Sequence, residues 1–185
     1  VVYKTKKSYY ARGNSIMFVL DISPSMAVKD IENSNRIDVA RRIIKDFAIH
    51  FAGDSLGLSV FAENASILLL PTIDTSNLLS RLETVEIGEL GDGTAIGASI
   101  ILALTNLKRE PSSSHVILLT DGENNTGKVN LHTIVEILRK KEISLYILKL
   151  GSDGYGNIEY FDKKKGKKYS GTYYTCLLYT SDAAD

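Results

Sequence analysis

A continuous apolar run, Ile16–Leu20, ends at Asp21, and this junction constrains the fold more than any other feature of the chain. A run of strand length that is apolar at every position indicates a strand buried on both faces, and such strands are typical of parallel sheets covered by helices. The polar residues that follow are Asp21, Ser23 and Ser25, at alternate positions. The sequence therefore predicts a central strand whose carboxyl end presents a carboxylate and two hydroxyls.

The remaining apolar segments alternate between strand-like runs and segments of helical periodicity. We expect strands over residues 56–62, 66–70, 115–120 and 143–150, and helices over 36–51, 76–82, 94–107 and 131–140. The turn at residues 63–64 is too short for a crossover, so segment 66–70 should run antiparallel, as an edge strand that ends near Pro71. Right-handed crossovers between the other strands then predict an α/β fold, a doubly wound, mostly parallel sheet with one antiparallel edge strand.

Composition limits the classes of function. The 185 residues include 22 Lys and Arg and 22 Asp and Glu, so no net charge points to nucleic acid or to an anionic membrane surface as a partner. The single cysteine, Cys176, excludes a disulfide framework and a thiolate metal cage. No apolar run approaches the roughly 20 residues of a membrane-spanning helix. One domain with one sizeable core is the expectation.

Two carboxylates are expected to meet at the edge of the sheet. Ligands of doubly wound sheets bind beyond the carboxyl ends of strands, where the winding direction reverses. Asp21 ends the first strand and Asp121 follows the strand over 115–120, so both carboxylates face one crevice if these strands are neighbours. Carboxylate and hydroxyl oxygens at such a position suit Mg²⁺, Mn²⁺ or Ca²⁺ rather than a soft metal.

Three segments together resemble a von Willebrand factor A (VWA) domain with its metal-ion-dependent adhesion site. They are Asp21-Ile22-Ser23-Pro24-Ser25, Gly91-Asp92-Gly93-Thr94 and Thr120-Asp121-Gly122. The family pattern is D-x-S-x-S, then a threonine in a second loop, then an aspartate after an apolar strand. All five positions are filled, by Asp21, Ser23, Ser25, Thr94 and Asp121. The resemblance covers roughly residues 15–150 and implies a Rossmann-like fold, with those five residues as ligands of a divalent metal. Asp92, Gly93, Gly122 and Lys128 are candidates for the surroundings or the rim of this site, although Asp92 could equally be a turn residue and Lys128 a solvated side chain.

Within that family, residues 18–26, 93–97 and 119–122 are similar to bacterial Bat-type aerotolerance proteins, and residues 158–171 resemble an insertion that those proteins carry after the last sheet strand. This resemblance implies a domain of a protein anchored in a bacterial inner membrane. Residues 1–14 would be a basic linker from the membrane region, and residues 15–174 the VWA domain, with a hairpin-like insertion at about 152–174. The implied partners are a protein that offers an Asp or Glu to the metal, other Bat-like VWA proteins, and a MoxR-type AAA+ ATPase.

The end of the chain departs from the family. Residues 175–185 carry no apolar helical stripe, so we interpret them as a non-native tail and expect the last helix of the fold to be missing. One face of the strand over 143–150 would then lose its cover. Because each large apolar side chain contributes about 1.5–3 kcal/mol when buried, we expect a fragile or aggregation-prone protein.

Three alternatives compete with metal-dependent partner binding. Residues 122–129 nearly match a phosphate-binding loop and favour a nucleotide-binding or phosphoryl-transfer domain that depends on Lys128, although Val129 stands where Mg²⁺ needs Ser or Thr. The hydroxyls of Ser25 and Thr94 could instead cap helices, since both stand near predicted helix starts. The metal could also tie loops together without taking part in any interaction. The sequence places no nucleophile beside a base, so we expect a module that is not an enzyme.

Overall fold

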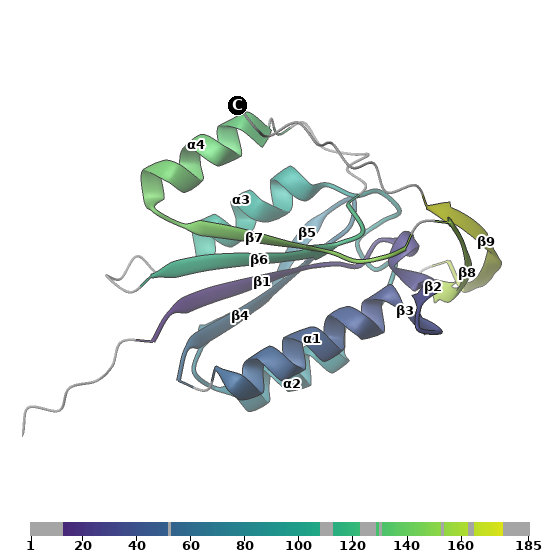
Figure 1. The fold of residues 1–185 in the computed structure, drawn as a ribbon, viewed down its shortest axis with the longest axis horizontal. Coiled ribbons are helices and arrows are strands. Elements are labelled where there is room, and N and C mark those ends of the chain that lie inside the picture. The colour runs from purple at the N-terminus through teal and green to yellow at the C-terminus, as the bar shows by residue number, and fades with distance from the viewer. Residues whose placement is uncertain are drawn as a thin grey trace, which may run out of the picture.

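The computed structural model describes residues 13–51, 53–107, 113–122, 129, 131–152, 154–162 and 165–175. Its larger sheet consists of β1 (Ser15–Asp21), β4 (Ser55–Phe61), β5 (Ala65–Thr72), β6 (Ser114–Thr120) and β7 (Ser144–Lys149). Their order is β5-β4-β1-β6-β7 (Figure 1). All neighbours are parallel except β5, which runs antiparallel to β4 at the edge. The predicted sheet is therefore confirmed.

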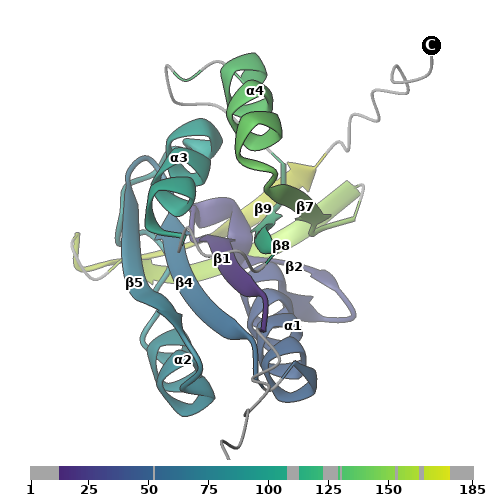
Figure 2. The same cartoon turned by 90° about the vertical axis from the view of Figure 1, so that its left-hand side faces the viewer.

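Helices cover both faces of this sheet. Figure 2 shows α1 (Arg36–His50) and α2 (Thr75–Glu83) on one side, and α3 (Ile96–Asn106) and α4 (Leu131–Lys141) on the other. Every residue of β1 is buried, and its side chains alternate between the two layers. Phe18 belongs to the core under α1 and α2, whereas Val19 belongs to the core under α3 and α4. The run of apolar residues is explained by this double burial.

The winding direction of the sheet reverses beside β1. The chain passes from β1 through α1 to β4 on one side, and β6 pairs with the opposite edge of β1, with Leu20 beside Leu119. Asp21 and Asp121 therefore follow neighbouring parallel strands at their carboxyl ends. This is the position at which doubly wound sheets bind their ligands.

A second, antiparallel sheet stands at the same end of the molecule (Figure 1). It contains β2 (Val28–Ile31), β3 (Ser34–Asn35), β8 (Gly154–Asp162) and β9 (Lys167–Thr175), in the order β3-β2-β8-β9, and the short 3₁₀ helix η1 (Pro24–Ala27) leads into it. The sequence indicates the β8–β9 hairpin but not β2 or β3. These two strands are short and partly exposed, and β2 pairs both with β3 and with β8, which lies more than 120 residues later in the chain.

Several of the predictions concern residues that the structure does not describe. These are the basic segment before residue 13 and, apart from Thr175, the proposed non-native tail with the missing last helix. The domain boundaries and the tail therefore stay predictions. Among the described helices, none has the length and apolarity needed to cross a bilayer.

Strand β7 exposes large apolar side chains. Tyr146 and Leu148, which point to the same face, are 54% and 39% exposed, while Leu150 just beyond the strand is buried in the core under α1. Apolar side chains gathered on one surface promote association.

We therefore expect the double substitution Tyr146→Thr with Leu148→Thr to reduce self-association, measured by light scattering, with little change in the free energy of unfolding. Leu145→Thr is the matched control, because Leu145 packs against the core under α3 and α4 and its loss should destabilise the protein. Unchanged scattering in the double variant would contradict the assignment of this face as the source of association.

Candidate metal centre

Asp21 is held rigidly at the end of β1. Its side chain is fully buried, the backbone N–H of Ser23 donates to Oδ1 over 2.9 Å, and the hydroxyl of Thr120 donates to Oδ2 over 2.6 Å. Both carboxylate oxygens thus have a fixed orientation. Thr120, the last residue of β6, was not among the predicted residues of the site.

The two serines that follow present their hydroxyls together. Ser23 and Ser25 are 1% and 9% exposed, and their Oγ atoms lie 3.1 Å apart. Pro24 occupies the first turn of η1, and the N–H of Met26 donates to the Ser23 carbonyl over 3.0 Å, so the backbone turns tightly here. Ser23 is the N-cap residue of η1, but its side chain makes no capping hydrogen bond.

Thr94 reaches the same end of the sheet from a separate loop. The next residue, Ala95, donates its N–H to the carbonyl of Ala62 over 2.8 Å, directly after β4. Thr94 itself is only 2% exposed. Helix α3 starts at Ile96 with Ala95 as its N-cap and no side-chain cap. Neither Ser25 nor Thr94 therefore occupies the N-cap position of the helix that it stands beside.

Asp121 completes the set from the end of β6. It is 3% exposed, and Nη1 of Arg36 donates to its Oδ2 over 3.0 Å. The following residue, Gly122, has φ of +90°, which favours glycine, and its N–H donates to Thr120 Oγ1 over 3.1 Å. We call Asp21, Ser23, Ser25, Thr94 and Asp121 the candidate metal centre. All five are buried. Asp21 ends β1 and the two serines follow it, Asp121 follows β6, and Thr94 stands in the loop before α3, beside the end of β4.

Electrostatics at the centre favour a cation. Burial, and next the negative charge of Asp121, raise the pKa of Asp21 to about 6, against the lowering effect of hydrogen bonds from Ser23 and Thr120. An ionised Asp21 is therefore costly without a compensating positive charge. A divalent ion beside both carboxylates would reverse this cost.

Arg36 and Asp30 belong to the surroundings of this centre, and neither was among its predicted residues. The Arg36 side chain is buried, and it forms salt bridges to Asp30 over 2.6 Å and to Asp121 over 3.0 Å. The burial of Arg36 could have been predicted from helical spacing. Arg36 stands four residues before Ala40 and eight before Ile44, on the face of α1 that is buried against the sheet.

Comparison with known proteins agrees with this geometry. The family model for the von Willebrand factor type A domain matches residues 16–123, which include the whole candidate metal centre. The chain belongs to the VWA family. An uncharacterised protein of Borreliella burgdorferi is 31% identical to this VWA domain over 93% of the present chain and 50% of its own length. The chain thus spans about half the length of the curated relatives it matches.

Solved structures of other VWA proteins have the same fold. An aerotolerance-related membrane protein of Bacteroides fragilis is 26% identical, with a TM-score of 0.73 over 86% of this chain and 81% of that one. The protein BatB of Bacteroides thetaiotaomicron is 25% identical, with a TM-score of 0.71 over 90% and 81%. Proximal thread matrix protein 1 of the mussel byssus, solved with zinc in its metal-ion-dependent adhesion site, is 26% identical, with a TM-score of 0.62 over 75% of this chain and 36% of that one.

The described residues among the four predicted around the rim of the metal site differ from one another in exposure and contacts. The four are Asp92, Gly93, Gly122 and Lys128. Asp92 is exposed and forms a salt bridge over 2.6 Å with Lys165, at the tip of the β8–β9 hairpin. Gly93 directly precedes Thr94, and Gly122 follows Asp121. Lys128 and most of the loop that nearly matches a phosphate-binding motif lie outside the described residues.

The donor set of the VWA domain fits a hard divalent cation. No group of three or more His, Cys, Asp or Glu residues with metal-binding geometry occurs in the described part of the chain. The centre instead combines two carboxylates with three hydroxyls, all of them oxygen donors of the kind that Mg²⁺, Mn²⁺ and Ca²⁺ accept. The positive charge of Arg36, which Asp30 shares, offsets only part of the negative charge of the two carboxylates of the centre.

Proposed function

We propose that this VWA domain binds a divalent cation and uses it to hold a carboxylate of a protein partner. The observation that carries the proposal is the convergence of five buried oxygen-bearing side chains from three separate loops at the switch point of the sheet. The hydroxyls of Ser23 and Ser25 lie 3.1 Å apart, at a spacing that one small cation can share.

Each residue has a definite part in this proposal. Ser23, Ser25 and Thr94 would bind Mg²⁺, or Mn²⁺ or Ca²⁺, through their hydroxyl oxygens. Asp21 and Asp121 would hold it directly or through water. Because hydroxyls are neutral and Arg36 offsets part of the charge on Asp121, the bound ion would retain positive charge for an Asp or Glu of the partner.

The whole protein to which the domain belongs is also a matter of proposal. Similarity to BatB and to the aerotolerance-related membrane protein of Bacteroides fragilis supports a membrane-anchored, Bat-like protein of a bacterial inner membrane. The zinc-occupied site of the mussel protein supports a metal at the corresponding position. Other Bat-like VWA proteins and a MoxR-type AAA+ ATPase are the partners to test first. The proposed role is binding rather than catalysis.

Metal binding is tested by thermal unfolding and calorimetric titration with Mg²⁺, Mn²⁺ and Ca²⁺. An ion present at 100 times its dissociation constant should raise the free energy of unfolding by about 2.7 kcal/mol. Ser23→Ala should lose this response. Ser59→Ala is the matched control, since Ser59 is also buried but donates to the Phe18 carbonyl within the sheet. An equal response in Ser23→Ala and wild type would refute the assignment.

Partner binding separates the proposal from its alternatives. Binding of a purified MoxR-type ATPase or Bat-like VWA protein should require the metal and should disappear with EDTA and in Asp21→Ala. Binding that survives both treatments would count decisively against the model. If chelation lowers the unfolding temperature and changes no interaction, the metal is only a scaffold. A nucleotide-binding domain would instead depend on Lys128 more than on Ser23 or Thr94.

A further inference from the structure

We infer that Arg36 is a positioning residue of the candidate metal centre, a built-in cation that holds Asp121 in the metal-free protein and sets how tightly the centre binds its divalent ion. This inference rests on the proposed metal binding. It concerns a residue outside the five predicted ligands, on a different element, the first turn of α1.

The guanidinium of Arg36 bridges two buried carboxylates. Nη1 donates to Asp121 Oδ2 over 3.0 Å. On its other side, Nη2 donates to Asp30 Oδ2 over 2.6 Å, and Nε lies 3.1 and 3.2 Å from the two Asp30 oxygens. Arg36 itself has no exposed surface. A planar, permanently charged group with several donors is suited to such a bridge, and lysine is not.

The surrounding backbone is built around this bridge. At Gly151, φ is +126°, which favours glycine, and a Cβ atom there would lie 3.0 Å from Cζ of Arg36 and so press on the guanidinium. The next residue, Ser152, donates its N–H to Asp30 Oδ2 over 2.9 Å and its hydroxyl to the Asp30 carbonyl over 3.0 Å. Arg36 is therefore fixed in place by β2 and by the segment that leads into the β8–β9 hairpin.

Arg36 and Asp30 should act in opposite directions on a cation bound at the metal centre, because their charges have opposite signs. The positive charge of Arg36 attracts Asp121 and repels any cation that approaches the same carboxylate. Removing that charge takes away the guanidinium cation that pairs with Asp121 and Asp30, and a divalent ion should then bind more tightly. Removing the charge of Asp30 takes away one negative charge beside Arg36, and the ion should bind more weakly. The two substitutions should thus change the affinity in opposite directions.

The experiment titrates Mn²⁺ into the protein by calorimetry and compares Arg36→Met, Asp30→Asn and Arg42→Met. Arg42→Met is the matched control, because it removes the same charge from an exposed position of α1. We expect the dissociation constant for Mn²⁺ to fall about tenfold in Arg36→Met and to rise about tenfold in Asp30→Asn, as charges a few ångströms away require. Arg42→Met should match the wild type.

A purely structural role for Arg36 predicts a different pattern, in which both substitutions loosen the centre and weaken Mn²⁺ binding. That result would overturn the inference while leaving the proposed function intact. Wild-type protein that fails to bind Mn²⁺ would refute the proposed function and this inference together. If Arg36→Met does not fold, Arg36→Gln replaces it, because glutamine removes the same charge but keeps a donor toward Asp121. Tighter Mn²⁺ binding in Arg36→Gln supports the inference, and equal or weaker binding overturns it.

Discussion

Substituting Asp21 with asparagine should stabilise the metal-free protein at pH 7 and remove its response to divalent metal. Asp21 is fully buried, and burial together with the charge of Asp121 raises its pKa to about 6 from 3.8. The folded state therefore carries an unfavourable carboxylate charge at neutral pH. Asparagine has no charge and keeps one oxygen that can accept from the Ser23 N–H, while its NH₂ group would face the Thr120 hydroxyl, whose oxygen can accept. We expect a gain of about 1–3 kcal/mol in the free energy of unfolding without metal.

The pH dependence of this gain follows from the sign of the shift. Between pH 4 and 6 the unfolded chain loses its proton at Asp21 before the folded protein does, so the contribution of Asp21 to stability falls as pH rises through that window. The difference between Asp21→Asn and wild type should be small at pH 4, grow up to about pH 6 and then level off. Denaturant unfolding of both proteins at several pH values measures it.

The control for this prediction is Asp38→Asn. Asp38 lies on α1, and its side chain is 55% exposed, so its charge is solvated in both states and the substitution should change stability little. A loss of stability in metal-free Asp21→Asn at pH 7 would show that the carboxylate contributes more through its hydrogen bonds than its burial costs. Retained metal binding in this variant would argue that Asp21 is not a ligand.

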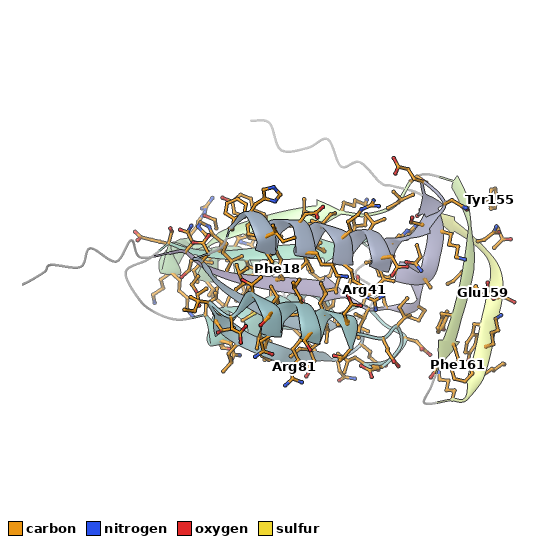
Figure 3. All side chains as sticks on the ribbon, turned by 90° about the horizontal axis from the view of Figure 1, so that it is seen from below. Phe18, Arg41, Arg81, Tyr155, Glu159 and Phe161 are labelled. Atoms are coloured by element: carbon orange, nitrogen blue, oxygen red, sulfur yellow. The ribbon has the colours of Figure 1, made fainter. Side chains whose placement is uncertain are left out.

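Phe18→Ala should lower the free energy of unfolding by about 3–5 kcal/mol, enough to unfold much of an ordinary domain. Phe18 lies at the centre of β1 with no exposed surface, facing the layer of α1 and α2 (Figure 3). Its ring meets that of Phe47 edge-on, with centroids 5.3 Å apart. Truncation removes a large buried surface and leaves a cavity between a central strand and a helix, where neither can move in to fill it.

Phe51→Ala is the matched control, because Phe51 contacts the same Phe47 ring at the edge of the core. Phe51 stacks on Phe47 with centroids 4.1 Å apart, but it is 47% exposed. Its substitution should cost about 1 kcal/mol, because only part of its surface leaves water on folding. Urea denaturation of the two variants measures both losses. Similar losses for Phe18→Ala and Phe51→Ala would contradict the position of β1 at the centre of the core.

The β8–β9 hairpin and the segment before it contact residues beside the candidate metal centre that are distant in the sequence. Figure 3 shows Tyr155, Glu159 and Phe161 along the hairpin, at the end of the molecule where the metal centre lies. Its base contacts Asp30 through Ser152, and its tip contacts Asp92 through Lys165. The β8–β9 hairpin and the segment before it therefore contact two residues beside the candidate metal centre, Asp30 and Asp92. Each of these lies more than 70 residues from its contact in the sequence. Any partner that binds at the centre approaches beside it.

The sequence by itself determined the elements whose signals are local. The apolar run of β1, the short turn before β5 and the D-x-S-x-S motif each depend on a few consecutive residues, and such local signals predicted the larger sheet. The five residues of the candidate metal centre were predicted from the resemblance of three short segments to the VWA family. Only the tertiary structure decided what depends on distant pairing. Strand β2 forms against β8, and Arg36 is buried only because Asp30 and Asp121 come together around it. A buried charge is tolerated when its partners are in place, and their convergence is a property of the folded chain that no single segment records.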